Sequence, residues 1–170
     1  KVSYLADNSY KEHLTNKPYV FLAPYCSANN PQKKWPHFHA LVEQLNIDFP
    51  ELTFVTAPGP DEINESKTYA AKVLFDRDNP TSLTQLIKII IDASFVITID
   101  TAAAHIASHA NKPGVLLMDC ERFKRIFLEK KQFVLGSNHT QMSDLKLNQV
   151  YPLIKDKLES CLNTLALDVN

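Results

Sequence analysis

A short polar segment, Asp100-Thr101 followed by His105, combines residue types that can bind an anion. It follows the apolar, β-branched run 95–99, which predicts a buried strand, and opens the Ala-rich segment 102–111, which predicts a helix. A strand that turns directly into a helix leaves the first helical N–H groups unpaired, at the positive end of the helix dipole. Such a terminus binds phosphates. A structural role also fits, with Thr101 capping the helix and His105 a packed polar residue.

Two earlier loops carry polar side chains that could complete such a site. The first has Ser27 and the pair Lys33-Lys34, and a loop lysine can meet a phosphate as a mobile point charge. The alternative, a solvated charge pair, is favoured for Lys34, and we expect Lys33 to have no buried partner. The second loop has Asp61 and Glu62, either of which could bind a ribose hydroxyl, although helix capping explains Asp61 nearly as well.

Alternating strand and helix patterns predict how these loops are positioned. Apolar runs predict strands over 19–23, 52–56, 73–75, 95–99 and 115–118, with a sixth over 133–135. Helical patterns predict five helices: one that begins at Pro36, one from Asp61 to about Lys72, one that begins at Asn79, one over 102–111, and one from about Leu147 to Leu165. The helix that begins at Asn79 has an apolar stripe of Leu83, Leu86, Ile87, Ile90 and Ile91.

This alternation indicates the α/β class, as a doubly wound, mostly parallel Rossmann-like sheet with helices on both faces. Ligands of such sheets bind at the carboxyl ends of the strands, near the switch point, so the loops after the first, second and fourth strands should surround one crevice. Residues 1–18 are polar and predict a lead-in or linker, and residues 19–170 predict a single domain. Because the sequence begins at Lys1 without a methionine, we expect a domain cut from a longer protein.

Composition excludes several classes of protein. The 170 residues suffice for one domain, and 45% hydrophobic and 22% charged residues are ordinary for a soluble protein. A net charge of −1 gives no reason to expect a nucleic-acid partner. Three scattered cysteines fit neither a disulfide framework nor zinc-ligand spacing, so we expect a reducing compartment and no metal. No apolar run is long enough to span a membrane.

The common nucleotide-binding motifs are missing as well. With Gly59, Gly114 and Gly136 as the three glycines, neither GxGxxG nor GxxxxGK[ST] occurs. Basic residues nevertheless gather at Lys33-Lys34 and over 122–125, and such local patches suit an anionic ligand or membrane headgroups. An anion site here would therefore have to be built from helix amides and lysines rather than from a glycine-rich loop.

Three segments together resemble the C-terminal domain of glycosyltransferase family 9, the heptosyltransferases. They are Ser27 with the K-K-W-P of 33–36, the T-S-L of 81–83, and D-T-A-A-A-H-I-A…K-P over 100–113. The family pattern for the last is roughly D-T-G-x-x-H-x-A-x-x-x-x-K-P, the most specific signal in the chain. The resemblance covers about residues 19–118. It implies the donor-binding, C-terminal half of a two-domain GT-B enzyme that uses no metal.

The resemblance also implies roles for individual residues at the diphosphate. Lys33 would neutralise the diphosphate, with Ser27 beside it, and the amides of Thr101 and Ala102 would hold the phosphates. His105 would support the site.

Sugar contacts are implied for three carboxylates. Glu62, with Asp61 as the second choice, would bind the ribose, and Asp100 would contact the donor sugar or orient the turn. The donor of this family is typically ADP-heptose, and the acceptor is a glycan of the lipopolysaccharide core held by the N-terminal half. That half would also supply the general base, so no catalytic residue is expected in this chain, and the chain alone should be inactive. A cytoplasmic location follows, with at most peripheral contact at the inner face of the inner membrane.

Two departures from the family pattern leave other interpretations open. Ala102 replaces the usual glycine, and residues 117–123 replace the family's F-G-P-T-x-P near the reacting sugar. The alternatives are a non-catalytic relative that binds a nucleotide or a protein partner, and another Rossmann-type nucleotide-binding enzyme. Titration with ADP-sugar, UDP-sugar and NAD(H) would distinguish them.

Overall fold

A six-stranded sheet organises the chain in the computed structural model, which describes residues 14, 18–123, 132–135 and 140–167. All five neighbouring pairs are parallel, in the order β3-β2-β1-β4-β5-β6. The strands are β1 (Tyr19–Ala23), β2 (Thr53–Thr56), β3 (Lys72–Val73), β4 (Phe95–Ile99), β5 (Gly114–Leu117) and β6 (Gln132–Leu135). The doubly wound α/β prediction is therefore confirmed, the sixth strand included. Most of the predicted lead-in, 1–18, lies outside the described residues.

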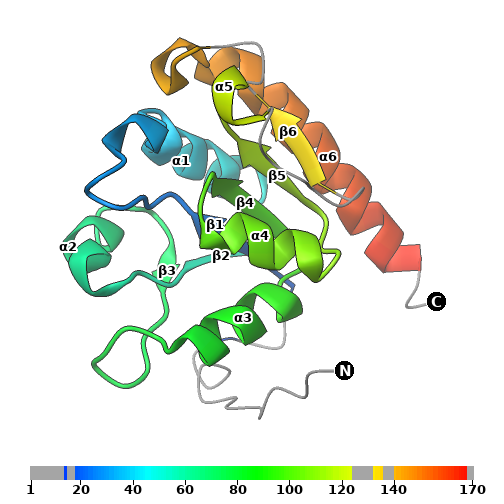
Figure 1. The fold of residues 1–170 in the computed structure, drawn as a ribbon. Coiled ribbons are helices and arrows are strands. Elements are labelled where there is room, and N and C mark those ends of the chain that lie inside the picture. Colours follow the sequence, from blue (N-terminus) through cyan, green and yellow to red (C-terminus); the bar gives the residue numbers. More distant parts are fainter. Residues whose placement is uncertain (1–13, 15–17, 124–131, 136–139, 168–170) are drawn as a thin grey trace.

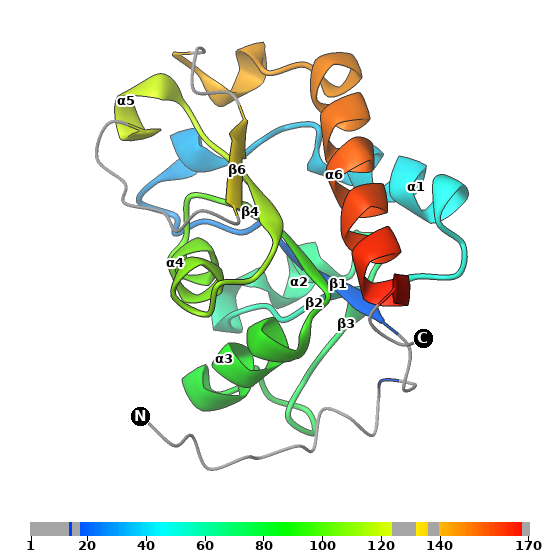
Figure 2. The same cartoon turned by 90° about the vertical axis from the view of Figure 1, so that its right-hand side faces the viewer.

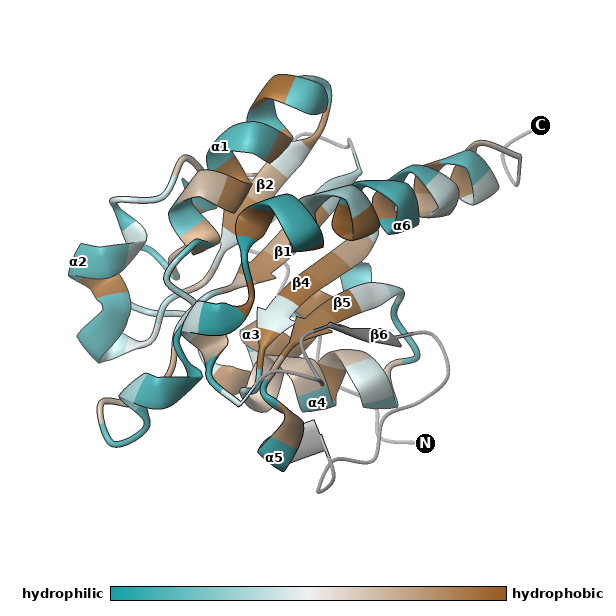
Figure 3. Cartoon of the chain, turned by 90° about the horizontal axis from the view of Figure 1, so that it is seen from above, coloured by the Kyte–Doolittle hydropathy of each residue, from teal (hydrophilic) through white to brown (hydrophobic). Residues whose placement is uncertain are grey.

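Helices cover both faces of this sheet (Figures 1 and 2). On one face lie α1 (Phe38–Asp48) and α6 (Leu147–Leu167), and on the other lie α3 (Leu83–Asp92) and α4 (Ala102–His109). Side chains alternate across each strand, so β4 sends Phe95, Ile97 and Ile99 to the α1–α6 face and Val96 to the α3–α4 face. The apolar residues accordingly concentrate on the central strands, with hydrophilic residues outside (Figure 3).

The first helix follows its predicted apolar pattern. Its buried residues are Phe38, Leu41, Val42 and Leu45, the four expected from helical spacing. The adjoining Trp35 is 1% exposed and donates from Nε1 to the Leu145 carbonyl oxygen at 2.7 Å, which fixes the loop before α1. The loop that carries Lys33 and Lys34 is therefore anchored at its end by a buried indole.

The predicted stripe of α3 is only partly correct. Ile90 is buried, but Leu83 is 64% exposed, and Gln85 and Ile89 point inward. Ser82 caps the helix in a capping box, in which its hydroxyl accepts from the Gln85 N–H and the Gln85 side chain accepts from the Ser82 N–H. That reciprocal cap draws Gln85 inward and leaves Leu83 on the outer side of the first turn.

The long polar helix predicted over 61–72 is wrong. The chain forms a 3-10 turn, η3 (Pro60–Glu62), and one α-turn, α2 (Ile63–Ser66), before β3. Ser66 Oγ donates to the Ile63 carbonyl and Thr68 Oγ1 to the Glu65 carbonyl, each at 2.7 Å, and such local side-chain hydrogen bonds compete with a continuing helix. Further short elements are η2 (Pro31–Lys33), α5 (Cys120–Phe123) and η4 (Met142–Asp144).

Gly114, at the start of β5, meets a close backbone neighbour. A Cβ atom added there would lie 2.4 Å from the Val96 carbonyl oxygen on β4. No side chain fits at that distance, so glycine allows β4 and β5 to pair at this point in the sheet.

Candidate functional site

Two predicted site residues, Lys33 and Asp100, meet at the switch point of the sheet. Lys33 ends η2 in the loop after β1, Asp100 follows β4, and these neighbouring strands are where the strand order reverses. Lys33 Nζ lies 2.7 Å from Asp100 Oδ2 and donates to the Asp100 carbonyl oxygen at 3.3 Å. The side chains are 24% and 12% exposed. The expectation that Lys33 lacks a buried partner is therefore wrong, because the nearly buried Asp100 carboxylate pairs with it.

Helix α4 begins beside this ion pair with its terminus uncapped. Thr101 is the N-cap residue, in extended backbone, yet its side chain makes no capping hydrogen bond. Among the described residues, the buried Oγ1 atoms of Thr101 and of Thr98 on β4 have no hydrogen-bond partner. A buried hydroxyl without a partner costs free energy, and a ligand at this terminus could relieve that cost. The N-terminus of α4, where the first helical amides favour an anion, therefore follows within two residues of the carboxylate that pairs with Lys33.

Ala102 fits this turn without a glycine. It is the first residue of α4, and it is exposed. Among the described non-glycine residues, a positive φ occurs at Arg77 and Asn111 and not at Ala102. The methyl group at Ala102 therefore faces solvent on ordinary backbone, and the amide of that residue remains oriented by the helix.

The two acidic residues of the loop after β2 lie in different environments. Glu62 is half-buried, and as the third residue of η3 its Oε2 accepts from the N–H of the N-cap residue Gly59 at 2.7 Å. Burial raises the pKa of Glu62, the charges of Glu65 and Asp61 raise it further, and the Gly59 hydrogen bond lowers it. Asp61 is exposed. One oxygen of Glu62 is thus occupied by the backbone, and any ribose contact would use the other.

Two predicted residues have no contact that brings them to the ion pair. Ser27 is exposed and its Oγ accepts from the Asn29 N–H at 3.3 Å. His105 is exposed on α4, where it lines a cavity of about 350 Å³ with Ile87, Ile91 and Ile106 between α3 and α4. The supporting roles of Ser27 and His105 remain predictions.

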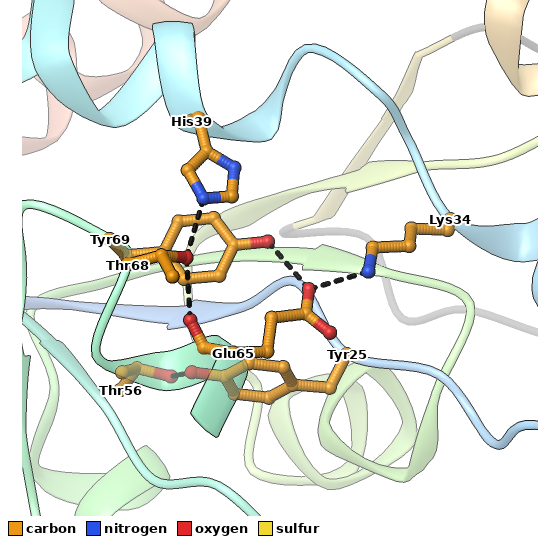
Figure 4. A network of polar contacts seen from close by, with 7 residues as sticks. All are labelled: Tyr25, Lys34, His39, Thr56, Glu65, Thr68 and Tyr69. Carbon is orange, nitrogen blue, oxygen red and sulfur yellow. Dashed lines mark hydrogen bonds and ion pairs between the residues drawn. The ribbon is translucent and has the colours of Figure 1, made fainter. Parts of the chain in front are cut away.

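Sequence reasoning missed a polar network around Glu65 that includes Lys34 (Figure 4). Glu65 Oε1 on α2 lies 2.8 Å from Lys34 Nζ and accepts from the Tyr69 hydroxyl at 3.0 Å. Lys34 is therefore ion-paired rather than solvated, although 46% of its side chain is exposed. Below it, Thr56 Oγ1 donates to the Tyr25 hydroxyl at 3.0 Å, which joins β2 to the loop after β1. No local sequence pattern signals the Lys34–Glu65 contact, because it joins loops that follow different strands.

A second cavity lies away from the Lys33–Asp100 ion pair. A cavity of about 600 Å³ lies beside Phe95 and Gly114, the first residues of β4 and β5, and hence at the amino ends of the strands, opposite the ion pair.

In the part of the chain that the structure describes, no three potential metal-ligating side chains gather, and all three cysteines are free thiols. The same residues include no helix both long and apolar enough to cross a bilayer. The basic cluster predicted over 122–125 falls largely outside the described residues.

Fold and comparison together identify the class of protein. The strand order is that of a Rossmann-like domain with its ligand crevice between β1 and β4. The family model for glycosyltransferase family 9 (heptosyltransferase) matches residues 3–153, and the chain belongs to this family. No curated protein matches the sequence.

Solved structures show the same architecture. Escherichia coli heptosyltransferase WaaC with ADP is similar with a TM-score of 0.70 and 20% identity, over 87% of this chain and 47% of WaaC. E. coli ADP-heptose lps heptosyltransferase II is similar with a TM-score of 0.64 and 22% identity, over 94% of this chain and 53% of that protein. The family 9 glycosyl transferase of Veillonella parvula DSM 2008 is similar with a TM-score of 0.69 and 18% identity, over 89% of this chain and 49% of that protein. The chain therefore spans about half the length of these proteins and has the fold of one half of a GT-B enzyme.

Proposed function

We propose that this chain is the donor-binding half of a heptosyltransferase-like glycosyltransferase, and that its ligand is ADP-heptose or a similar nucleotide sugar. The observation that carries the proposal is the Lys33–Asp100 ion pair beside the uncapped terminus of α4, in a chain of family 9. Relatives with this fold were solved with ADP and with ADP-2-deoxy-2-fluoro heptose, which supports an adenine nucleotide.

In this proposal the lysine and the helix amides would assist the departure of a nucleoside diphosphate. Negative charge grows on the diphosphate as its bond to the sugar breaks, and preorganised amides and a lysine stabilise that charge. Amides of Thr101 and Ala102 would hold the phosphates, and Lys33 would move part of its interaction from Asp100 to the ligand. The Asp100 carboxylate, close to that anion, would then favour a donor whose sugar hydroxyls can donate to it.

The rest of the reaction belongs to a second domain in this proposal. That domain would hold the acceptor, a lipopolysaccharide-core glycan, and the general base, and no metal would take part. The enzyme would work in the cytoplasm, with at most peripheral contact at the inner face of the inner membrane.

Calorimetric titration tests the donor assignment directly. We expect binding of ADP and of an ADP-sugar, weaker binding of a UDP-sugar, and none of NADH. Preference for the UDP-sugar would contradict the adenine assignment, and it is a real alternative because the Staphylococcus aureus MnaA–UDP structure has a similar fold, with a TM-score of 0.57 at 14% identity. Binding of NADH would indicate instead a different Rossmann-type enzyme.

A further inference from the structure

The neighbouring residues Lys33 and Lys34 are held on opposite sides of the loop after β1. Lys33 pairs with Asp100 after β4 at 2.7 Å, and Lys34 pairs with Glu65 after β2 at 2.8 Å. Because β1 lies between β2 and β4 in the sheet, the two ion pairs hold the η2 turn and the residue after it from both sides of the loop.

Glu65 is itself held by a buried tyrosine (Figure 4). The Tyr69 hydroxyl donates to Glu65 Oε1, and the Tyr69 ring, 6% exposed, stacks on His39 with centroids 4.0 Å apart. Phe38 and Tyr25 meet the same ring edge-on, each at 6.0 Å. Burial, and then the charge of Glu65, raises the pKa of Tyr69, so its hydroxyl stays protonated and remains a donor. The Glu65 carboxylate is thus attached to the core rather than to a mobile loop.

We propose that Glu65 is a positioning residue for the anion site, which acts through Lys34 to keep Lys33 beside the α4 terminus when a phosphate draws Lys33 away from Asp100. This rests on the proposed donor function. In the free protein both ion pairs hold the turn, but a bound diphosphate competes for Lys33 Nζ and weakens one of them. The Lys34–Glu65 pair is then the remaining ionic restraint on η2 among the described contacts.

The sign of the effect separates positioning from simple electrostatics. Glu65→Gln removes a negative charge near an anion site, and through-space electrostatics alone would then strengthen anion binding. Positioning predicts the opposite, a loss of affinity, because the neutral amide holds Lys34 less firmly. Glutamine keeps an oxygen that can accept from Tyr69, so the core contact survives. Because the Lys34–Glu65 pair is partly exposed, we expect a loss of about two- to fivefold.

The test is a double-mutant cycle, with ADP as the probe in calorimetric titrations of the wild type, Lys33→Ala, Glu65→Gln and the double variant. Glu51→Gln is the matched control, because Glu51 is an exposed carboxylate in the turn between α1 and β2. We expect Glu65→Gln to lose about two- to fivefold in affinity, and to lose nothing further in the Lys33→Ala background. The control should bind as the wild type does, and thermal melts should place all variants in the folded state.

Each other outcome overturns a distinct statement. Suppose that the wild type binds ADP and that Lys33→Ala binds it more weakly. Unchanged or stronger binding by Glu65→Gln then overturns the positioning role of Glu65 and leaves the proposed donor site standing. A loss that persists in the Lys33→Ala background shows that Glu65 acts independently of Lys33, which also overturns it. Absence of ADP binding by the wild type overturns the proposed function and the inference together.

Discussion

At the scale of single residues, the Lys33–Asp100 ion pair would determine how the proposed site responds to a diphosphate. Lysine in the free protein already has an anionic partner, so a diphosphate must replace one ionic contact with another rather than neutralise an isolated cation. Helix amides do not face that competition. In the proposed function the affinity for a nucleotide would therefore depend on both the lysine and the helix amides, and a mutation of the lysine should affect binding and folding at once.

Lys33→Ala should weaken binding of ADP and of an ADP-sugar by roughly five- to 150-fold, as the loss of a charge-assisted hydrogen bond worth about 1–3 kcal/mol. It should also lower stability by about 1 kcal/mol or less, because Asp100 loses a partner in a partly screened site. Calorimetry and thermal melts measure the two effects. Lys67→Ala, which removes an exposed lysine near α2, is the control. Intact binding with a lower melting temperature would make Lys33 a structural residue.

Glu62 gives a pH-dependent prediction at the same scale. Its pKa is raised above the ordinary 4.5, chiefly by burial. A carboxyl with a higher pKa in the folded chain binds its proton more tightly there, so its stabilising contribution is present at low pH and is lost as the pH rises through the folded pKa. We expect the free energy of unfolding of the wild type, minus that of Glu62→Gln, to fall between about pH 4 and about pH 7. Urea unfolding at both values tests this, and a rising difference would contradict it.

At the scale of elements, the accuracy of prediction depended on whether the decisive contacts were local. The runs 19–23 and 95–99 became β1 and β4 with unchanged bounds, because central parallel strands are apolar on both faces. The junction after β4 was predictable for the same reason. The predicted helix over 61–72 ends after one turn, where the hydroxyls of Ser66 and Thr68 make local hydrogen bonds that compete with helix. The Glu65–Lys34 contact had no local signal, since it depends on how the finished sheet brings two loops together.

The close approach of β5 to β4 yields a prediction for this scale. Gly114→Ala would place a Cβ atom 2.4 Å from the Val96 carbonyl oxygen, which lies on a central strand and cannot move freely. We expect a loss of about 1–3 kcal/mol in the free energy of unfolding, typical of overpacking. Gly59→Ala is the matched control, because its Cβ would meet the flexible end of Glu62 at 3.3 Å. Urea unfolding of both variants compares them, and equal stabilities would contradict the prediction.

At the scale of the whole molecule, the proposed function divides binding and transfer between two domains. The described residues fold as one sheet with hydrophobic cores on both faces, and the candidate anion site lies at the carboxyl ends of its central strands. Solved proteins with this fold are about twice as long, and this chain corresponds to 47% of WaaC and 53% of heptosyltransferase II. In the proposed function the acceptor and the general base belong to the remaining half.

The 170 residues alone should therefore bind a nucleotide sugar weakly and transfer nothing. Binding is expected because the lysine and the α4 amides are all within this chain, and it should be weak because contacts from a second domain, which would close over the donor, are missing. Transfer needs an acceptor oriented against the donor carbon and a base to take its proton, and neither group is assigned here. Calorimetry with ADP-heptose measures the first part, and release of ADP with and without a lipopolysaccharide-core acceptor measures the second. Acceptor-dependent release by the purified chain, abolished by Lys33→Ala, would show that the division of labour between the two halves is wrong. The expected result is binding of the donor without release of ADP, with binding weakened in Lys33→Ala.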